Sequence, residues 1–158
     1  MVLTRSLLLA VLCAAPAAAG ELPDTRPGWV IERTEQGYAE LVENVDGAVA
    51  ASPLNVVTRA SATVGAKSLG QDIPGNMVVG VFAPKFAIRL LEASVAAGIE
   101  APLRLYITEN SDGTATLSYK TAAHVLAPYA DEGGQTLTAL ATELDTILEQ
   151  IAEQAASE

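Results

Sequence analysis

Cysteine and histidine are almost absent from this chain, and their absence excludes several kinds of chemistry. The 158 residues contain one cysteine, Cys13, and one histidine, His124. A disulfide needs two cysteines, and a structural zinc ion takes four cysteine or histidine ligands. The sequence therefore excludes both an internal disulfide and a structural zinc site.

Basic residues are also scarce. Nine lysines and arginines stand against nineteen acidic residues, so the formal net charge is −10. This excess of negative charge opposes binding to phosphate backbones and to anionic membrane surfaces. We expect no nucleic-acid partner, and the chain also lacks a complete phosphate-binding loop, since residues 65–68 lack the earlier glycine that such a loop requires.

The N-terminal residues have the pattern of a secretory signal. Arg5 supplies positive charge, residues 6–15 form an apolar run too short to span a bilayer, and residues 17–19 fit a cleavage site before Gly20. A retained N-terminal anchor is the alternative. Cleavage would also remove Cys13 and would leave eight basic against nineteen acidic residues, a formal charge of −11. We expect a periplasmic or secreted protein with no membrane association after cleavage.

Hydrophobic periodicity predicts several strands and helices. We expect a leader over residues 20–28 and a first strand at 29–33. The leader and this strand form a segment at 20–35 that precedes the main domain. Residues 59–75 show no clear pattern. We expect further strands at 54–58 and 77–82 and a hairpin at 103–119. We expect helices at about 36–51, from 84 to a stop at Gly98, and at 122–127. A last helix follows Gly133-Gly134 and ends at about residue 156.

The hairpin is the most legible part of the chain. Its first strand alternates apolar and polar residues, residues 110–113 form the turn, and the second strand alternates again. One face then carries Leu103, Leu105, Ile107, Ala115, Leu117 and Tyr119, and the other carries Arg104, Tyr106, Thr108, Thr114, Thr116 and Ser118. The apolar face needs a cover, whereas the polar face is expected to be solvated.

Amphipathic helices are the natural cover for that apolar face. The last helix has an unbroken apolar stripe from Leu137 to Ile151, with acidic residues opposite that we expect to be solvated. In the helix after Pro84 we expect an apolar stripe of Ala87, Ile88, Leu91 and Val95, with Phe86 and Leu90 beside it. The apolar run at 77–82 predicts a strand buried on both faces. These patterns predict a single domain over 36–156: a two-layer α+β sandwich whose mainly antiparallel sheet has helices on one face.

Several short motifs resemble the domain-of-unknown-function 302 family. They are Phe82-Ala83-Pro84-Lys85, the strand Ala101 to Glu109, Asp112-Gly113 and Tyr119. The resemblance extends over about residues 36–156 and implies a small exported bacterial α+β domain of the TATA-box-binding-protein-like type. It implies no activity, because none is established for the family.

The chain departs from the family pattern at two places. The family usually has Gly-Asn before the proline, where this chain has Ala83 before Pro84. Many members also have a histidine in the segment that matches 58–63, and this chain has none there. Any ligand role of that histidine is therefore not carried over.

We expect a non-enzymatic binding or accessory domain that uses the polar face of the hairpin. The candidate ligand-binding residues are Arg104, Tyr106, Glu109 and Tyr119, because an arginine fork suits a small anion or a carboxylate of a protein partner. Dimerisation through the same face is a related outcome. The alternative is an ordinary wet sheet face on which Arg104 pairs with a neighbouring acid.

A redox accessory protein that handles haem or copper is the alternative function. His124 would be the metal ligand, with Met77 as a second ligand. The competing interpretation is an exposed helix histidine, and under the main hypothesis no cofactor is predicted. A hydrolase is a weaker third option, since no Gly-x-Ser-x-Gly elbow presents a serine beside His124.

Overall fold

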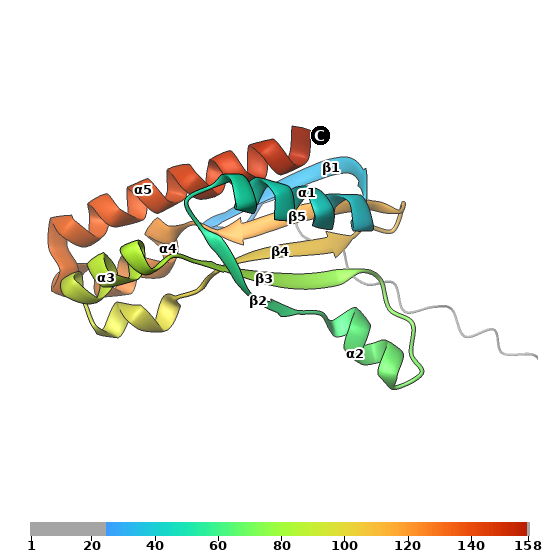
Figure 1. The fold of residues 1–158 in the computed structure, drawn as a ribbon, viewed down its shortest axis with the longest axis horizontal. Helices are drawn as coiled ribbons and strands as arrows, with labels where there is room; N and C mark the ends of the chain where they lie inside the picture. The colour runs from blue at the N-terminus through green and yellow to red at the C-terminus, as the bar shows by residue number, and fades with distance from the viewer. Residues whose placement is uncertain (1–24, 158) are drawn as a thin grey trace, which may run out of the picture.

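The computed structural model describes residues 25–157 (Figure 1). The proposed signal at 1–19 and most of the leader lie outside the described residues. The strands are β1 (Trp29–Gly37), β2 (Asn55–Ala60), β3 (Asn76–Phe82), β4 (Leu103–Glu109) and β5 (Thr114–Lys120). The α-helices are α1 (Tyr38–Ala51), α2 (Ala62–Ser68), α3 (Pro84–Ala93), α4 (Ala122–Leu126) and α5 (Ala130–Ser157), and two short 3₁₀ helices are η1 (Ala96–Glu100) and η2 (Ala127–Tyr129).

The five strands form one open antiparallel sheet in the order β1-β5-β4-β3-β2. The first strand pairs with the last, with Trp29 opposite Lys120 and Glu32 opposite Leu117. The expected hairpin therefore supplies β4 and β5, which lie in the interior of the sheet between β1 and β3. The predicted α+β architecture with a mainly antiparallel sheet is confirmed.

Helices cover one face of this sheet. In Figure 1, α5 extends along the length of the molecule beside α1, whereas α3 and α4 lie at one end. The stripe predicted for the last helix is buried throughout, and its members meet Leu41 and Val45 of α1 and Leu105, Ile107 and Leu117 of the sheet in a single core. Burial of this apolar surface is the main favourable term in the stability of the fold.

The turn of the hairpin has the predicted form. Gly113 has a φ of +88°, which glycine adopts without strain, and Asp112 accepts hydrogen bonds from the backbone N–H and the hydroxyl of Thr114. Both hydrogen bonds lower the pKa of Asp112 from its usual value, and the bond from the Thr114 hydroxyl has the larger effect. The turn thus sets the register that places the β4 and β5 side chains on their two faces.

Two expectations about the middle of the chain need correction or completion. The unassigned stretch 59–75 contains α2, which has no buried residue and so gave no hydrophobic pattern. The strand predicted at 77–82 to be buried on both faces is next to the edge strand, so only its helix side is covered. Val79 and Val81 are buried there, while Val78 is partly exposed on the other face.

The main stripe expected in the helix after Pro84 is not its buried face, which is formed instead by the two residues placed beside that stripe. Phe86 and Leu90 are the buried pair, whereas Ile88, Leu91 and Val95 are exposed. The helix ends at Ala93 rather than near Gly98, which lies inside η1 and does not have a positive φ. Because the helix stops a turn earlier, the next core residue after Leu90 is Ala97, and Val95 is exposed.

The row of hydroxyls expected on a solvated face is also partly buried. Thr116 and Ser118 are fully buried, because β5 lies between β1 and β4 and the larger side chains of both neighbours flank it. Thr116 donates to Asn110 Oδ1 at 3.0 Å, and Ser118 donates to the carbonyl of Tyr106 at 3.4 Å. These hydroxyls therefore serve the fold rather than a ligand.

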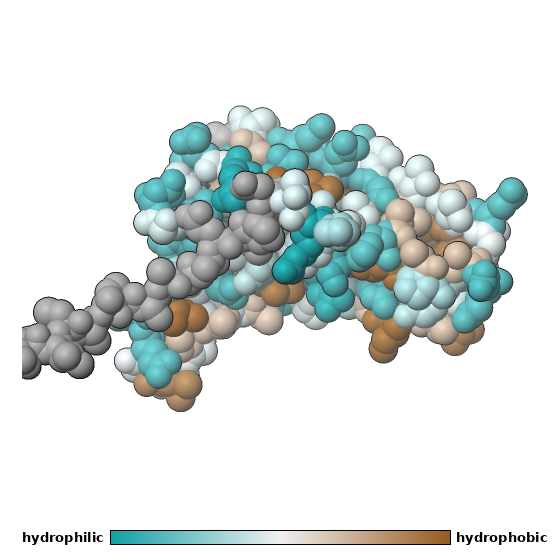
Figure 2. Space-filling view, turned by 180° about the vertical axis from the view of Figure 1, so that it is seen from behind, coloured by the Kyte–Doolittle hydropathy of each residue, from teal (hydrophilic) through white to brown (hydrophobic). Residues whose placement is uncertain are grey.

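Exposed apolar side chains gather at two separate corners of the molecule. Figure 2 shows brown surface over α2 and over the α3–η1 region, with a mixed polar surface between them. The exposed residues are Val64 and Leu69 at the first corner, and Ile88, Leu91, Val95 and Ile99 at the second. Within residues 25–157, no helix combines the length and the apolarity needed to span a membrane.

Candidate ligand-binding site

The face of the sheet that the helices leave uncovered carries three rows of side chains. Directly opposed residues in an antiparallel sheet point to the same face, so the register defines each row. The rows consist of Trp29, Lys120, Arg104 and Gly80, then Ile31, Ser118, Tyr106 and Val78, then Arg33, Thr116, Thr108 and Asn76. The first two rows bring cationic and aromatic groups from three strands, β1, β5 and β4, together.

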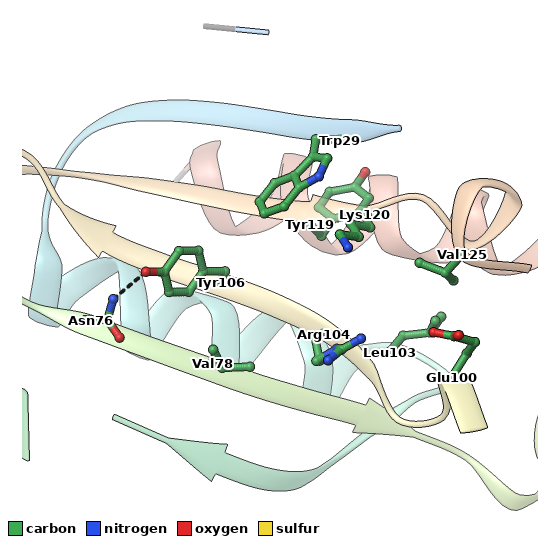
Figure 3. Close-up of a pocket in the computed structure, with 10 residues that line it drawn as sticks. All are labelled: Trp29, Asn76, Val78, Glu100, Leu103, Arg104, Tyr106, Tyr119, Lys120 and Val125. Atoms are coloured by element: carbon green, nitrogen blue, oxygen red, sulfur yellow. Dashed lines mark hydrogen bonds between the residues drawn. The ribbon is translucent and has the colours of Figure 1, made fainter. Parts of the chain in front are cut away.

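A cavity of about 400 Å³ lies over these two rows (Figure 3). Its size falls within the usual range for small-molecule sites. Four of the five strands or their flanking turns contribute to it, with α4 at one end. The lining residues are Trp29, Asn76, Val78, Glu100, Leu103, Arg104, Tyr106, Tyr119, Lys120 and Val125.

Cationic groups surround the aromatic ring of Trp29 at the edge of this cavity. The Arg26 guanidinium lies 5.2 Å and the Lys120 ammonium 5.7 Å from the centre of the ring. Both distances suit a cation–π interaction. Arg104 lies across from Lys120, since its neighbour Leu105 is opposite Tyr119. It is exposed and makes no hydrogen bond or ion pair with any other residue from 25 to 157.

The Tyr106 hydroxyl faces the cavity from the second row. It accepts a hydrogen bond from the side-chain amide of Asn76 at 2.5 Å (Figure 3). Because a phenol can both donate and accept, its own proton is left to donate to another group. Arg104 and Tyr106 thus provide two donor side chains on one strand, two residues apart.

Glu100 is the one carboxylate in the lining. It sits at the η1 end of the cavity and accepts a hydrogen bond from the Tyr129 hydroxyl at 3.0 Å. This bond raises the pKa of Tyr129. Figure 3 shows Arg104 between Glu100 at one end and Tyr106 at the other, so an anionic group would lie farthest from Glu100 near Tyr106.

The structure brings together two of the four residues predicted from the sequence. Arg104 and Tyr106 share the open face and the cavity. Tyr119 borders the cavity, but only 3 % of its surface is exposed and its ring belongs to the core on the helix side. Glu109 lies opposite the buried Ala115, also on the helix side, and accepts a hydrogen bond from the backbone N–H of Gly75 at 2.6 Å.

The structure separates His124 from Met77. His124 is exposed in α4 and its ring lies over Gly28, just beyond the end of β5. Met77 is opposite Ile107, toward the other end of the sheet, where its sulfur contacts Arg59. Among residues 25–157, no three histidine, cysteine or acidic side chains converge in a way that would hold a metal ion. The haem or copper hypothesis stays a prediction that rests on His124 alone.

Sequence reasoning missed several lining residues, of which Trp29 and Lys120 matter most. Both residues lie in segments whose alternation of apolar and polar residues predicts a strand. The pairing of β1 with β5, however, joins residues 91 positions apart, as the Trp29–Lys120 pair shows. No local pattern reports such a pairing.

Comparisons with known proteins give one family and one fold. The family model described as "Domain of unknown function DUF302" matches residues 30–155. A solved structure, the uncharacterised conserved DUF302 protein from Bacillus stearothermophilus, superposes with a TM-score of 0.72 at 17% sequence identity, covering 82% of this chain and 99% of that chain. No curated protein matches the chain.

Proposed function

Since this chain belongs to the DUF302 family, whose description names no activity, we propose its function from the cavity itself: it binds a small anionic ligand with an apolar body on the open face of the sheet. The proposed role is that of an exported, periplasmic binding or accessory domain without catalysis. Export rests on the signal-like pattern that ends at residue 19.

The concentration of positive charge at the cavity is the observation that supports this proposal. Arg104 and Lys120 line the cavity and Arg26 lies beside Trp29 at its edge, against one lining carboxylate, Glu100, although the formal net charge of the chain is −10. A local positive field on an acidic protein attracts anions and repels cations. Arg104 adds a planar fork of donors that matches a carboxylate or a phosphate.

The rest of the lining favours a ligand with an apolar part. Trp29, Val78, Leu103 and Val125 present apolar surface, and Tyr106 adds an aromatic ring with one available donor. A ligand that buries such surface gains about 25 cal/mol for each Å² removed from water. The described lining residues include no serine, cysteine or histidine, so binding accounts for the side chains present better than nucleophilic catalysis does.

Trp29 makes this proposal easy to test, because it is the only tryptophan in the chain and it lines the cavity. We expect phenylacetate, an anion with an aromatic body, to change the fluorescence of Trp29 in a saturable way. Phenethylamine, which has the same ring and a positive charge, should bind at least about tenfold more weakly, because it meets the cations of the cavity.

Replacement of Arg104 by alanine should weaken phenylacetate binding by about 10- to 100-fold, the loss expected for a hydrogen bond to a charged group. Lys67→Ala is the matched control, because Lys67 is an exposed cation on α2, away from the cavity. Equal binding of phenylacetate and phenethylamine, or an unchanged affinity in Arg104→Ala, would contradict the proposal.

A further inference from the structure

A second cavity of about 200 Å³ lies at the other side of β1, between the sheet and the C-terminal half of α5. It shares only Tyr119 with the lining of the first cavity. Its wall carries four carboxylates, Glu32 from β1 and Asp145, Glu149 and Glu153 from α5, and no basic residue. The sequence predicted that the acidic side of α5 would be solvated. Three of its carboxylates, from Asp145, Glu149 and Glu153, also line this cavity.

The spacing of the helical carboxylates concentrates their charge. Residues 145, 149 and 153 follow one another at intervals of four, so their side chains line one face of the helix, and like charges at this spacing destabilise it. Glu32, Glu149 and Glu153 make no ion pair or hydrogen bond with other residues of the described chain. Asp145 accepts hydrogen bonds from the backbone N–H groups of Ala122 and Ala123, which satisfy its oxygens without adding a cation.

Tyr119 supplies an independent observation at the same place. Its side chain is almost completely buried and its hydroxyl makes no hydrogen bond with any residue from 25 to 157. Burial and then the charges of Glu149, Asp145, Glu32 and Glu153 raise the pKa of Tyr119, so the phenol stays neutral. A neutral phenol beside four carboxylates has lone pairs that can accept from an N–H donor.

We propose that this second cavity binds a flexible organic cation with several spaced ammonium groups, of the polyamine class, with Tyr119, Glu149 and Glu153 as its principal contacts. The carboxylates are distributed along the wall and, over residues 25–157, do not converge as ligands of a metal ion would. Spaced ammonium groups, each with two or three N–H donors, match spaced acceptors better than one small ion does. The anion site of the first cavity is not needed for this inference.

Calorimetric titration of the purified chain with spermidine tests the proposal. We expect saturable binding that weakens by at least about tenfold in Glu149→Gln/Glu153→Gln, because two charged acceptors are lost. Glu43→Gln/Glu92→Gln is the matched control, since it removes the same charge from positions on α1 and α3 that are likewise exposed but do not line the second cavity. It should change the affinity by less than about twofold. Equal losses in the two double variants would show general charge attraction and overturn the proposal.

Tyr119→Phe separates a specific site from an acidic surface. It should weaken spermidine binding by about two- to tenfold, the loss of one neutral hydrogen bond, while the melting temperature stays as in the unaltered chain. An unchanged affinity in this variant would overturn the role of Tyr119. Binding of magnesium ions at the same site with an affinity equal to that of spermidine would overturn the assignment of an organic cation.

Discussion

Gly28 controls how the chain enters the first strand. Its φ is +72°, and its carbonyl accepts a hydrogen bond from the backbone N–H of Thr121 at 3.0 Å, which joins the start of β1 to the end of β5. A Cβ atom at this position would lie 2.1 Å from the ring of His124. The position therefore requires glycine for its backbone conformation and for the close approach of the ring.

Replacement of Gly28 by alanine should lower the free energy of unfolding by about 1–3 kcal/mol, because both the left-handed conformation and the contact with His124 oppose a side chain. Urea unfolding followed by circular dichroism measures this loss. Gly70→Ala is a matched control, since Gly70 has a φ of +71° but no atom within 4 Å of its Cβ position. Equal losses at the two glycines would show that the His124 contact contributes nothing.

Single residues could be assigned to a face of the sheet from the sequence, but not to a site. The alternation in β4 correctly placed Arg104 and Tyr106 on the open face. The same alternation placed Tyr119 on the apolar face. Tyr119 and Glu109 were nevertheless counted among the candidate ligand-binding residues, because both are near the ends of their strands. Proximity along a strand does not overcome the pleat, which sends neighbouring side chains to opposite faces.

Helix α4 is held in place by a side chain from another helix. Its N-cap, Thr121, accepts from the backbone N–H of His124 at 3.2 Å, and Asp145 of α5 accepts from Ala122 and Ala123 at 2.5 and 3.2 Å. A carboxylate at a helix N-terminus satisfies N–H groups that have no partner inside the helix and interacts favourably with the helix dipole. A helix of five residues depends on such contacts, because it is too short to be stable alone.

Asp145→Ala should therefore destabilise the protein by about 1–3 kcal/mol, the usual effect of removing an acceptor from buried or charged hydrogen bonds. Asp145→Asn, which keeps one acceptor oxygen, should lose less. Differential scanning calorimetry of the two variants checks the order. As a control, Gln150→Ala on the exposed side of α5 should stay within about 0.5 kcal/mol. A larger loss in Asp145→Asn than in Asp145→Ala would contradict the capping role.

At the scale of elements, predictability followed the amount of surface that each element buries. The stripe of α5 was visible because nine of its residues are buried along 28 positions. Helix α2 buries none and escaped prediction. Helix α3 was found, but its buried face was misassigned, since Ser94 ends the helix with extended backbone and the apolar residues beyond it no longer follow the helical period.

The whole molecule separates its charges between two faces. The first cavity has three basic residues in its lining or at its edge, whereas the cavity beside α5 gathers four carboxylates. Within residues 25–157, Arg59 pairs with Asp46 and Arg89 pairs with Glu143, and both ion pairs are exposed. Exposed pairs contribute little, so the excess negative charge is largely uncompensated within the chain.

This imbalance predicts that salt stabilises the protein. Raising the ionic strength from about 0.01 M to about 0.15 M shortens the Debye length from about 30 Å to about 8 Å, which screens repulsion among the carboxylates. The melting temperature should rise, and it should rise less in Glu149→Gln/Glu153→Gln, which has less repulsion to screen. A melting temperature that falls with salt would show that attraction between unlike charges dominates instead.

The pairing of β1 with β5 has a consequence for the order of events during synthesis. Trp29 meets Lys120, so the leading strand has no neighbour until nearly the whole sheet has been made. At a ribosomal rate of about 5–20 residues per second, that wait lasts about 5–20 seconds. During this interval the segment that contains Trp29 and Ile31 has no strand to pair with. A chaperone that binds extended apolar segments can therefore bind it most readily before the fifth strand emerges.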